Sequence, residues 1–162
     1  NGDKVYIISH IGPQRGLGFL DLWKEKYQII FYDIIRNYND IIQGLLFGHV
    51  HADTFSFLDK PNHPLESPVK AVFANPSITP YDKTNPAFRI FEYDTENFEI
   101  LDFRNYFLDL KYIQTKNVTW TRNSLAPYWE EEYRFTSSFQ VPDLSEASLL
   151  HVYNRMRNDP LF

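Results

Sequence analysis

The sequence predicts an α/β fold that tends towards α+β, and three observations lead to this prediction. Short runs of apolar and β-branched residues recur along the chain, which is typical of buried strands. One longer segment has apolar residues at spacings of three and four, the period of an amphipathic helix. A helix separates the first two strands, whereas the middle of the chain is rich in strands. We therefore expect a sheet-based domain flanked by helices.

The first elements form a strand, helix, strand unit. Residues 4–8 are predicted to be a buried strand, residues 20–38 an amphipathic helix and residues 41–47 a second buried strand. A glycine-bearing loop over residues 14–18 separates the first strand from the helix. The order strand, helix, strand predicts a right-handed crossover, so the two strands are expected to lie in one sheet.

Further strands and a terminal helix complete the prediction. Asp143 is an expected N-cap with Glu146 three positions on, so a helix should run from there to about Asn158, before Pro160. The loops between the strands contain several prolines. The additional predicted strands cover residues 55–58, 69–74, 88–93 and 98–107.

The chain is expected to divide near residue 110. Residues 1–110 hold the predicted sheet, and residues 111–162 form an aromatic-rich, mostly helical C-terminal subdomain. Polar turns with interleaved aromatic residues replace the strand pattern beyond Lys111. Most of the aromatic rings from Phe103 to Phe135 are expected to pack in the core, because aromatic side chains bury large areas. A lipid-docking or partner surface is the alternative.

Composition excludes several classes of protein. The 162 residues include no cysteine, which rules out disulfide scaffolds, thiol catalysis and zinc-thiolate sites. A net charge of −5 argues against binding nucleic acid by phosphate neutralisation. No apolar run reaches the ~18 residues of a membrane-spanning helix, so none is expected.

Three of the five histidines follow the ends of predicted strands. His10 follows the first strand, and His49 and His51 follow the second. Ligands of open α/β sheets bind beyond the carboxyl ends of the strands, so these loops are expected to be neighbours. In extended backbone both imidazoles of a His-x-His pair point to the same side, and Gly48 would allow a sharp turn. The pattern favours a zinc site, whereas His63 and His151 are expected to be structural.

These residues also carry a family resemblance. Gly48-His49-Val50-His51 resembles the final Gly-His-x-His motif of calcineurin-like metallophosphoesterases, and the His10 block resembles the strand-end histidine block upstream of that motif. The resemblance is closest to the acid sphingomyelinase-like phosphodiesterases. Supporting segments are Trp23 with Tyr27, residues 47–53, residues 75–80, residues 85–89, and Tyr93-Asp94.

The resemblance implies a fold, a metal site and a reaction. The fold would be part of a metallophosphoesterase β-sandwich flanked by helices. His10 and His49 would bind one zinc ion and His51 its neighbour, so that a metal-bound hydroxide attacks the phosphorus of a phosphodiester. Tyr81 falls where the family has a substrate-facing aromatic residue, with an ordinary loop residue anchored by its ring as the alternative. No other catalytic residue is expected in this chain.

The family's early motifs are missing. Asp-x-His, Gly-Asp-x-x-Asp and Gly-Asn-His-Glu/Asp have no counterpart, and three histidines alone do not hold two catalytic zinc ions. We therefore expect this chain to be the C-terminal half of a dinuclear zinc phosphodiesterase, inactive by itself, with the N-terminal half of the same catalytic domain as its partner. The alternative is a non-catalytic remnant of the fold that acts as a binding or interaction module.

The resemblance also implies a compartment and a substrate class. Asn117-Val118-Thr119 is a glycosylation sequon, consistent with a secreted or lysosomal glycoprotein. Relatives divide between sphingomyelin and nucleotide or other phosphodiesters. Because the chain has no saposin-like segment, a small phosphodiester is favoured over a sphingolipid.

Overall fold

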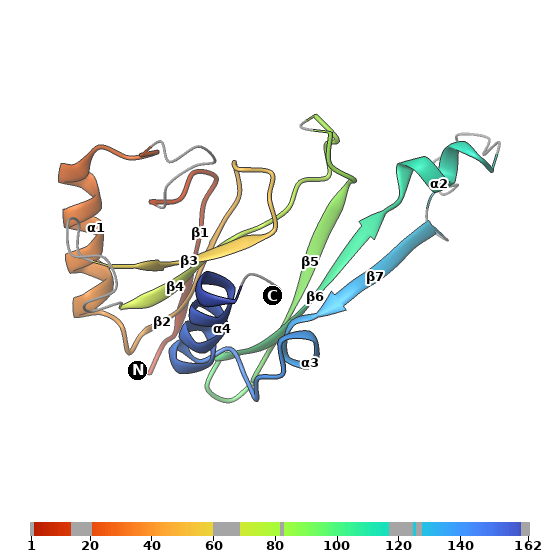
Figure 1. Cartoon of the computed structure of the whole chain (residues 1–162). Helices are drawn as coiled ribbons and strands as arrows, with labels where there is room; N and C mark the ends of the chain where they lie inside the picture. Colours follow the sequence, from red (N-terminus) through yellow and green to blue (C-terminus); the bar gives the residue numbers. More distant parts are fainter. Residues whose placement is uncertain are drawn as a thin grey trace.

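The computed structural model places two β-sheets and four helices within the residues that it describes (Figure 1). This arrangement confirms the predicted α/β class. The described residues are 2–13, 21–59, 69–81, 83–116, 125 and 128–159.

The first sheet has the strand order β1-β2-β4-β3. Its strands are β1 (Val5–Ile8), β2 (Ile42–Phe47), β3 (Thr54–Leu58) and β4 (Lys70–Ala74). β1, β2 and β4 run parallel, and β3 is antiparallel to β4. The first two strands therefore lie in one sheet, as predicted, and because they pair directly and in parallel, their carboxyl ends lie at the same edge.

Helix α1 (Glu25–Asn37) joins β1 to β2 and covers one face of the first sheet (Figure 1). Its buried residues are Tyr32 and Ile35, which pack against β2, β3 and β4. The helix begins at Glu25 and not at Leu20, which lies outside the described residues. The resulting core cluster consists of Tyr32, Ile35, Ile42, Leu45, Phe47, Leu58 and Val72.

A second apolar stripe on α1 faces outwards. Tyr27, Ile30, Ile34 and Tyr38 are all exposed, although they belong to the apolar pattern that predicted the helix. Their spacing of three and four residues places them on one side of the helix. The helix is therefore apolar on two faces, of which only one is covered by the described residues.

The second sheet is antiparallel, with strand order β5-β6-β7. Its strands are β5 (Ala87–Tyr93), β6 (Ile100–Leu108) and β7 (Trp129–Arg134). β5 and β6 match predicted strands, whereas β7 was not predicted. The run Glu130–Glu132 breaks the apolar alternation that marks a strand in the sequence, since β7 exposes these carboxylates.

Three further helices lie in the second part of the chain: α2 (Leu110–Gln114) comes between β6 and β7, whereas α3 (Phe135–Phe139) and α4 (Glu146–Asn158) follow β7. α4 ends at Asn158 as predicted, but its N-cap is Ser145. The Asp143 carboxylate accepts hydrogen bonds from the backbone N–H and hydroxyl of Ser145 at 3.0 and 2.6 Å. Asp143 thus orients the cap and does not serve as the cap itself.

The main core lies between the two sheets and α4. Phe103 on β6 is at its centre, with ring contacts to Phe73, Phe91, Tyr133 and Phe135. Of the aromatic rings from Phe103 to Phe135 that were expected to supply core, Phe103 and Phe135 are buried in it. The buried members are Phe57, Ala71, Phe73, Phe103, Phe135, Val141, Leu144, Leu149 and Val152.

The division near residue 110 stays a prediction. Within the described residues, β7 pairs with β6 and α4 packs against β4, so the segment beyond Lys111 shares the core of the preceding strands. Among the described helices, none is long and apolar enough to cross a membrane.

Candidate functional site

The candidate site lies where the parallel strands of the first sheet end. The Gly48 N–H donates to the carbonyl oxygen of His10 at 2.9 Å, which continues the β1–β2 pairing beyond both strands. Asn75, directly after β4, donates from its backbone N–H and from Nδ2 to the Phe47 carbonyl oxygen at 2.8 and 2.9 Å. These hydrogen bonds fix the strand ends relative to one another.

His10 and His49 lie side by side at this edge. His49 Nδ1 is 3.3 Å from His10 Nε2, and the ring planes are nearly perpendicular, at 78°. Both residues are exposed. Two nitrogens bound to one tetrahedral zinc ion at about 2.0–2.1 Å are about 3.3–3.4 Å apart. The donor atoms of this pair therefore fit one metal ion.

The backbone that presents the histidines differs from the expectation. His49 and His51 have φ values of 73° and 53°, so neither is extended. Gly48 is not among the residues with positive φ, and a Cβ built on it would lie 3.8 Å from the nearest atom, the His10 carbonyl oxygen. The prediction that Gly48 supplies the sharp turn is wrong, because the histidines themselves adopt the left-handed conformation.

His51 occupies a different environment from the pair. It is half-buried, and its Nδ1 atom is inaccessible to solvent. Within the described ranges, no group of three or more histidine, aspartate or glutamate side chains is arranged to hold a metal ion. The described residues therefore provide a two-nitrogen site and not a complete coordination shell.

The other predicted residues lie elsewhere. Tyr81, in the loop after β4, is 82% exposed, so little of its ring is anchored by packing. His151 is exposed on α4. His63 and the sequon residue Asn117 lie outside the described residues.

A charged cluster behind the histidine loop was not predicted. Asp53, two residues after His51, forms an ion pair with Arg89 of β5 and accepts a hydrogen bond from the hydroxyl of Tyr133 of β7. Arg89 is a charged residue within a largely apolar strand. Its side chain points inwards, on the same face of the strand as that of Phe91, while Ile90 faces outwards. The alternation along β5 shows in the sequence that Arg89 and Phe91 share one face of the strand. Which of the two faces is buried depends on the strand's register in the sheet, which the sequence does not show.

Burial governs the protonation of this cluster. It lowers the pKa of Arg89 to about 10 and raises the pKa of Tyr133 to about 12. At neutral pH the guanidinium therefore stays charged and the phenol stays protonated. The guanidinium carbon also lies 4.3 Å from the centroid of the Phe103 ring, a favourable cation–π arrangement.

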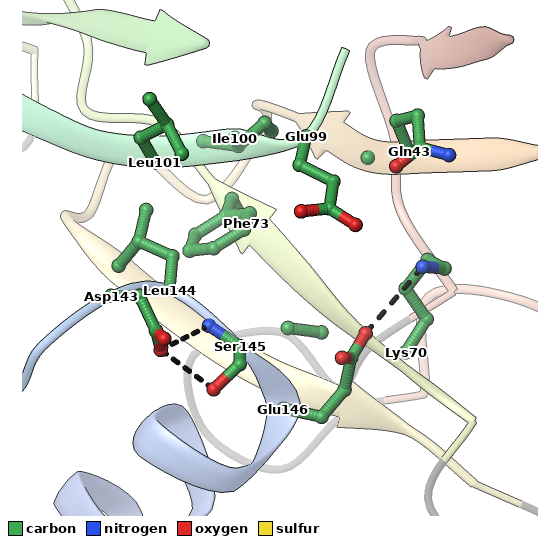
Figure 2. Close-up of a pocket in the computed structure, with 12 residues that line it drawn as sticks. Gln43, Lys70, Phe73, Glu99, Ile100, Leu101, Asp143, Leu144, Ser145 and Glu146 are labelled. Carbon is green, nitrogen blue, oxygen red and sulfur yellow. Dashed lines mark hydrogen bonds and ion pairs between the residues drawn. The ribbon is translucent and has the colours of Figure 1, made fainter. Parts of the chain in front are cut away.

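A cavity of about 260 Å³ lies at the opposite ends of the strands (Figure 2). It is bordered by Gly44 at the start of β2, Ile100 at the start of β6 and the amino end of α4. Lys70 and Glu146 form an ion pair at its rim, at 3.5 Å. This cavity is separate from the histidines, which follow the carboxyl ends of the same sheet.

Comparison with known proteins identifies the family. A family model described as the acid sphingomyelin phosphodiesterase C-terminal region matches residues 67–159, more than half of the chain. This chain belongs to the acid sphingomyelinase-like phosphodiesterase family. The resemblance inferred from Gly48, His49 and His51 is thereby confirmed at the level of the family.

Curated members of the acid sphingomyelinase-like phosphodiesterase family align with nearly the whole chain. This chain is 31% identical over 176 residues to "Acid sphingomyelinase-like phosphodiesterase 3b" of Mus musculus, and the alignment covers 99% of the chain and 35% of the relative. It is 32% identical to "Cyclic GMP-AMP phosphodiesterase SMPDL3A" of Homo sapiens, covering 92% of the chain and 32% of the relative. It is also 32% identical to "Sphingomyelin phosphodiesterase 1" of Caenorhabditis elegans, covering 96% of the chain and 26% of the relative. The chain thus spans about a third or less of these relatives.

Proposed function

We propose that this chain supplies the C-terminal part of a dinuclear zinc phosphodiesterase, with His10, His49 and His51 as metal ligands. The observation that carries the proposal is the approach of His10 Nε2 to His49 Nδ1 at the strand ends of a protein from a phosphodiesterase family. Bound zinc ions would activate water and neutralise the charge of a phosphoryl group. The residues of this chain hold the donor nitrogens in place through the Gly48–His10 and Asn75–Phe47 hydrogen bonds.

The remaining ligands are proposed to come from the N-terminal half of the same catalytic domain. A catalytic zinc site needs three protein ligands, and the described residues bring together only two nitrogens. The relatives extend over about three times the length of this chain, which leaves ample sequence for further ligands. By itself the chain is expected to be inactive.

Uncovered apolar surface supports this arrangement. β1 is an edge strand in the described sheet, and Ile8 at its end is 75% exposed. The outward stripe of α1, formed by Tyr27, Ile30, Ile34 and Tyr38, lies on the helix that follows it. Exposed edges and apolar stripes favour association with further structure. We propose that the N-terminal half covers both.

The substrate is proposed to be a small phosphodiester. Relatives carry the names of sphingomyelin and cyclic GMP-AMP phosphodiesterases, and both substrates contain a phosphodiester. The exposed His10 and His49 are proposed to face the phosphoryl group of this substrate. A sphingolipid is the second substrate class to be tested.

Zinc content and activity of the full-length protein test the proposal. We expect the full-length protein to contain stoichiometric zinc and to hydrolyse bis(p-nitrophenyl) phosphate. His49→Ala should lower this activity at least about 100-fold and should measurably lower the zinc content. His151→Ala is the matched control, because His151 is exposed on α4. A folded protein without zinc or activity would instead support the non-catalytic binding module. Sphingomyelin vesicles distinguish the lipid substrate from a soluble one.

A secreted or lysosomal location is also proposed. It rests on family membership and on the sequon at Asn117. Protein expressed through a secretory pathway should migrate faster after glycosidase treatment, and Asn117→Gln should abolish the shift contributed by that site. Unaltered migration of the wild-type protein would contradict modification at Asn117.

A further inference from the structure

The cluster of Asp53, Arg89 and Tyr133 connects the histidine loop to the second sheet. Asp53 lies between His51 and β3, so it belongs to the loop that carries His49 and His51. Its two carboxylate oxygens have different partners: Oδ1 pairs with Nη2 of Arg89, and Oδ2 accepts from the Tyr133 hydroxyl. Both partners belong to the facing sheet. The carboxylate is therefore held from two directions.

The second sheet presents these partners in one row. Arg89 of β5 is opposite Asn105 of β6, and Asn105 is opposite Tyr133 of β7. Paired residues of antiparallel strands project to the same face, so the three side chains leave the sheet together. Because β-strands fix such spacing, the row is a rigid support for a loop.

The cost of burying Arg89 indicates that the contact serves more than packing. Its side chain is only 2% exposed, and among the described residues its Nε and Nη1 atoms have no hydrogen-bond partner. A buried ion pair is often no more stabilising than an apolar replacement of the same volume. The Arg89 guanidinium pairs with Asp53 at the end of the histidine loop. The role of this ion pair is therefore to be sought in the loop and not in the stability of the core.

The loop itself needs external support. His49 and His51 both have positive φ, a conformation that costs about 1–3 kcal/mol per residue and persists only when its surroundings enforce it. Val50 between them is buried, which anchors the middle of the loop. Asp53 anchors its end. Without the second anchor the loop is free to relax towards ordinary backbone conformations.

We propose that Arg89 and Tyr133 are positioning residues that hold the Asp53 carboxylate and so keep the loop of His49 and His51 in its metal-binding conformation. The inference rests on the proposed function for its catalytic consequence, but the loop geometry can be tested without it. The alternative is that the cluster only joins the two sheets. In that case its loss would weaken the whole fold and would not loosen the loop selectively.

Hydrogen exchange of the full-length protein separates these possibilities. Tyr133→Phe removes the hydroxyl and keeps the ring packed against Phe103 and Phe139. We expect amide exchange over residues 48–53 to accelerate about tenfold, with exchange in β2 and β4 unchanged. Zinc affinity should fall about tenfold, a usual effect of removing a group that orients a ligand. Unchanged exchange in the loop, or equal acceleration throughout both sheets, would overturn the proposal.

Two further variants complete the experiment. Tyr106→Phe is the control, since the Tyr106 hydroxyl bonds Glu131 within the second sheet, away from the histidine loop. Arg89→Met removes the charge and keeps much of the volume, and it should accelerate exchange in the same loop if the variant remains folded. A loop that loosens in a protein without zinc or diesterase activity would support the positioning role while refuting the proposed function. A zinc-containing, active enzyme whose loop exchange is unaffected by these substitutions would support the proposed function and refute the positioning role.

Discussion

Gly44 of β2 and Gly48, which directly follows β2, differ in whether they have room for a side chain. A Cβ at Gly48 would meet only ordinary contacts, at 3.8 and 3.9 Å from atoms of His10. A Cβ at Gly44 would lie 2.7 Å from Ile100 Cδ1 and 3.1 Å from Tyr6 Cδ1. The glycine of the recognisable motif is therefore spatially replaceable, whereas the less conspicuous Gly44 leaves room for the side chains of Ile100 and Tyr6.

We predict that Gly44→Ala destabilises the protein by about 1–3 kcal/mol, the usual cost of overpacking. Gly48→Ala should change the free energy of unfolding by less than about 0.5 kcal/mol, because no strain or clash is introduced. Urea unfolding of both variants measures the difference. Equal destabilisation by the two substitutions would contradict the assignment of the tight contact to Gly44.

Asp102 is a buried carboxylate with several donors. It accepts hydrogen bonds from Arg134 Nε at 2.6 Å, from Thr136 N at 3.1 Å and Oγ1 at 2.5 Å, and from the Phe103 N–H at 2.8 Å. Burial opposes ionisation, but the hydrogen bonds from Thr136, Arg134 and Phe103 outweigh it and hold the pKa of Asp102 below 3.8. The folded protein thus binds this proton less readily than the unfolded chain.

This shift predicts a loss of stability in acid. The contribution of the Asp102 carboxylate is complete above about pH 4 and falls as the pH drops through the lower pKa of the folded state. We expect Asp102→Asn to be less stable than the wild type at pH 6, with the difference shrinking towards pH 2. Urea midpoints across this range give the result, with Glu130→Gln as the exposed control on β7. A constant difference at every pH would contradict it.

At the scale of the element, α4 depends on a cap that neighbouring residues assemble. Ser145 Oγ accepts from the Ser148 N–H at 3.3 Å, and Asp143 accepts from the hydroxyls of Ser145 and Ser148 at 2.6 and 2.7 Å. The motif with an acidic residue three positions on suggested Asp143 as the N-cap. Serine is also a preferred N-cap residue, but Ser148 and not an acidic residue lies three positions after Ser145, so the capping-box rule favoured Asp143.

Ser145→Ala should therefore lower the free energy of unfolding by about 1 kcal/mol, since it leaves an N–H of the first turn without its acceptor. Ser138→Ala on α3 is a suitable control because Ser138 is exposed within a helix. Thermal or urea unfolding compares the two. The cap assignment would be wrong if the two substitutions had equal effects.

The strands of the first sheet could be predicted, and β7 could not. The strands of the first sheet have short apolar or alternating patterns, and β2 and β4 are covered by α1 on one face and by the main core on the other. β7 contains Glu130–Glu132, whose side chains are exposed, and it joins the sheet by pairing with β6. Its strand conformation depends on a partner that lies distant in sequence, which local composition does not reveal.

For the molecule as a whole, α1 gives the clearest test of the proposed N-terminal half. Its outward residues, including Ile30, are exposed in the described structure. If the proposed N-terminal half covers them, Ile30→Gln should destabilise the full-length protein by about 1–2 kcal/mol through lost burial. Met156→Gln on α4, which is similarly exposed here, should cost less than about 0.5 kcal/mol. Equally small effects would show that the stripe of α1 remains in solvent.

The sequence by itself determined the family, the parallel pairing of the first two strands and the neighbourhood of His10 and His49. The family follows from the resemblance of the Gly48–His51 motif and the His10 block to those of known enzymes. The other two features depend on local periodicity and on the rule that parallel strands end at one edge. The burial of Tyr32 and Ile35 on α1, and the contacts of Arg89 and Tyr133 with Asp53, depend on tertiary packing. Period and composition specify which residues share a face. The packing of distant strands selects which face is buried and which charges meet there.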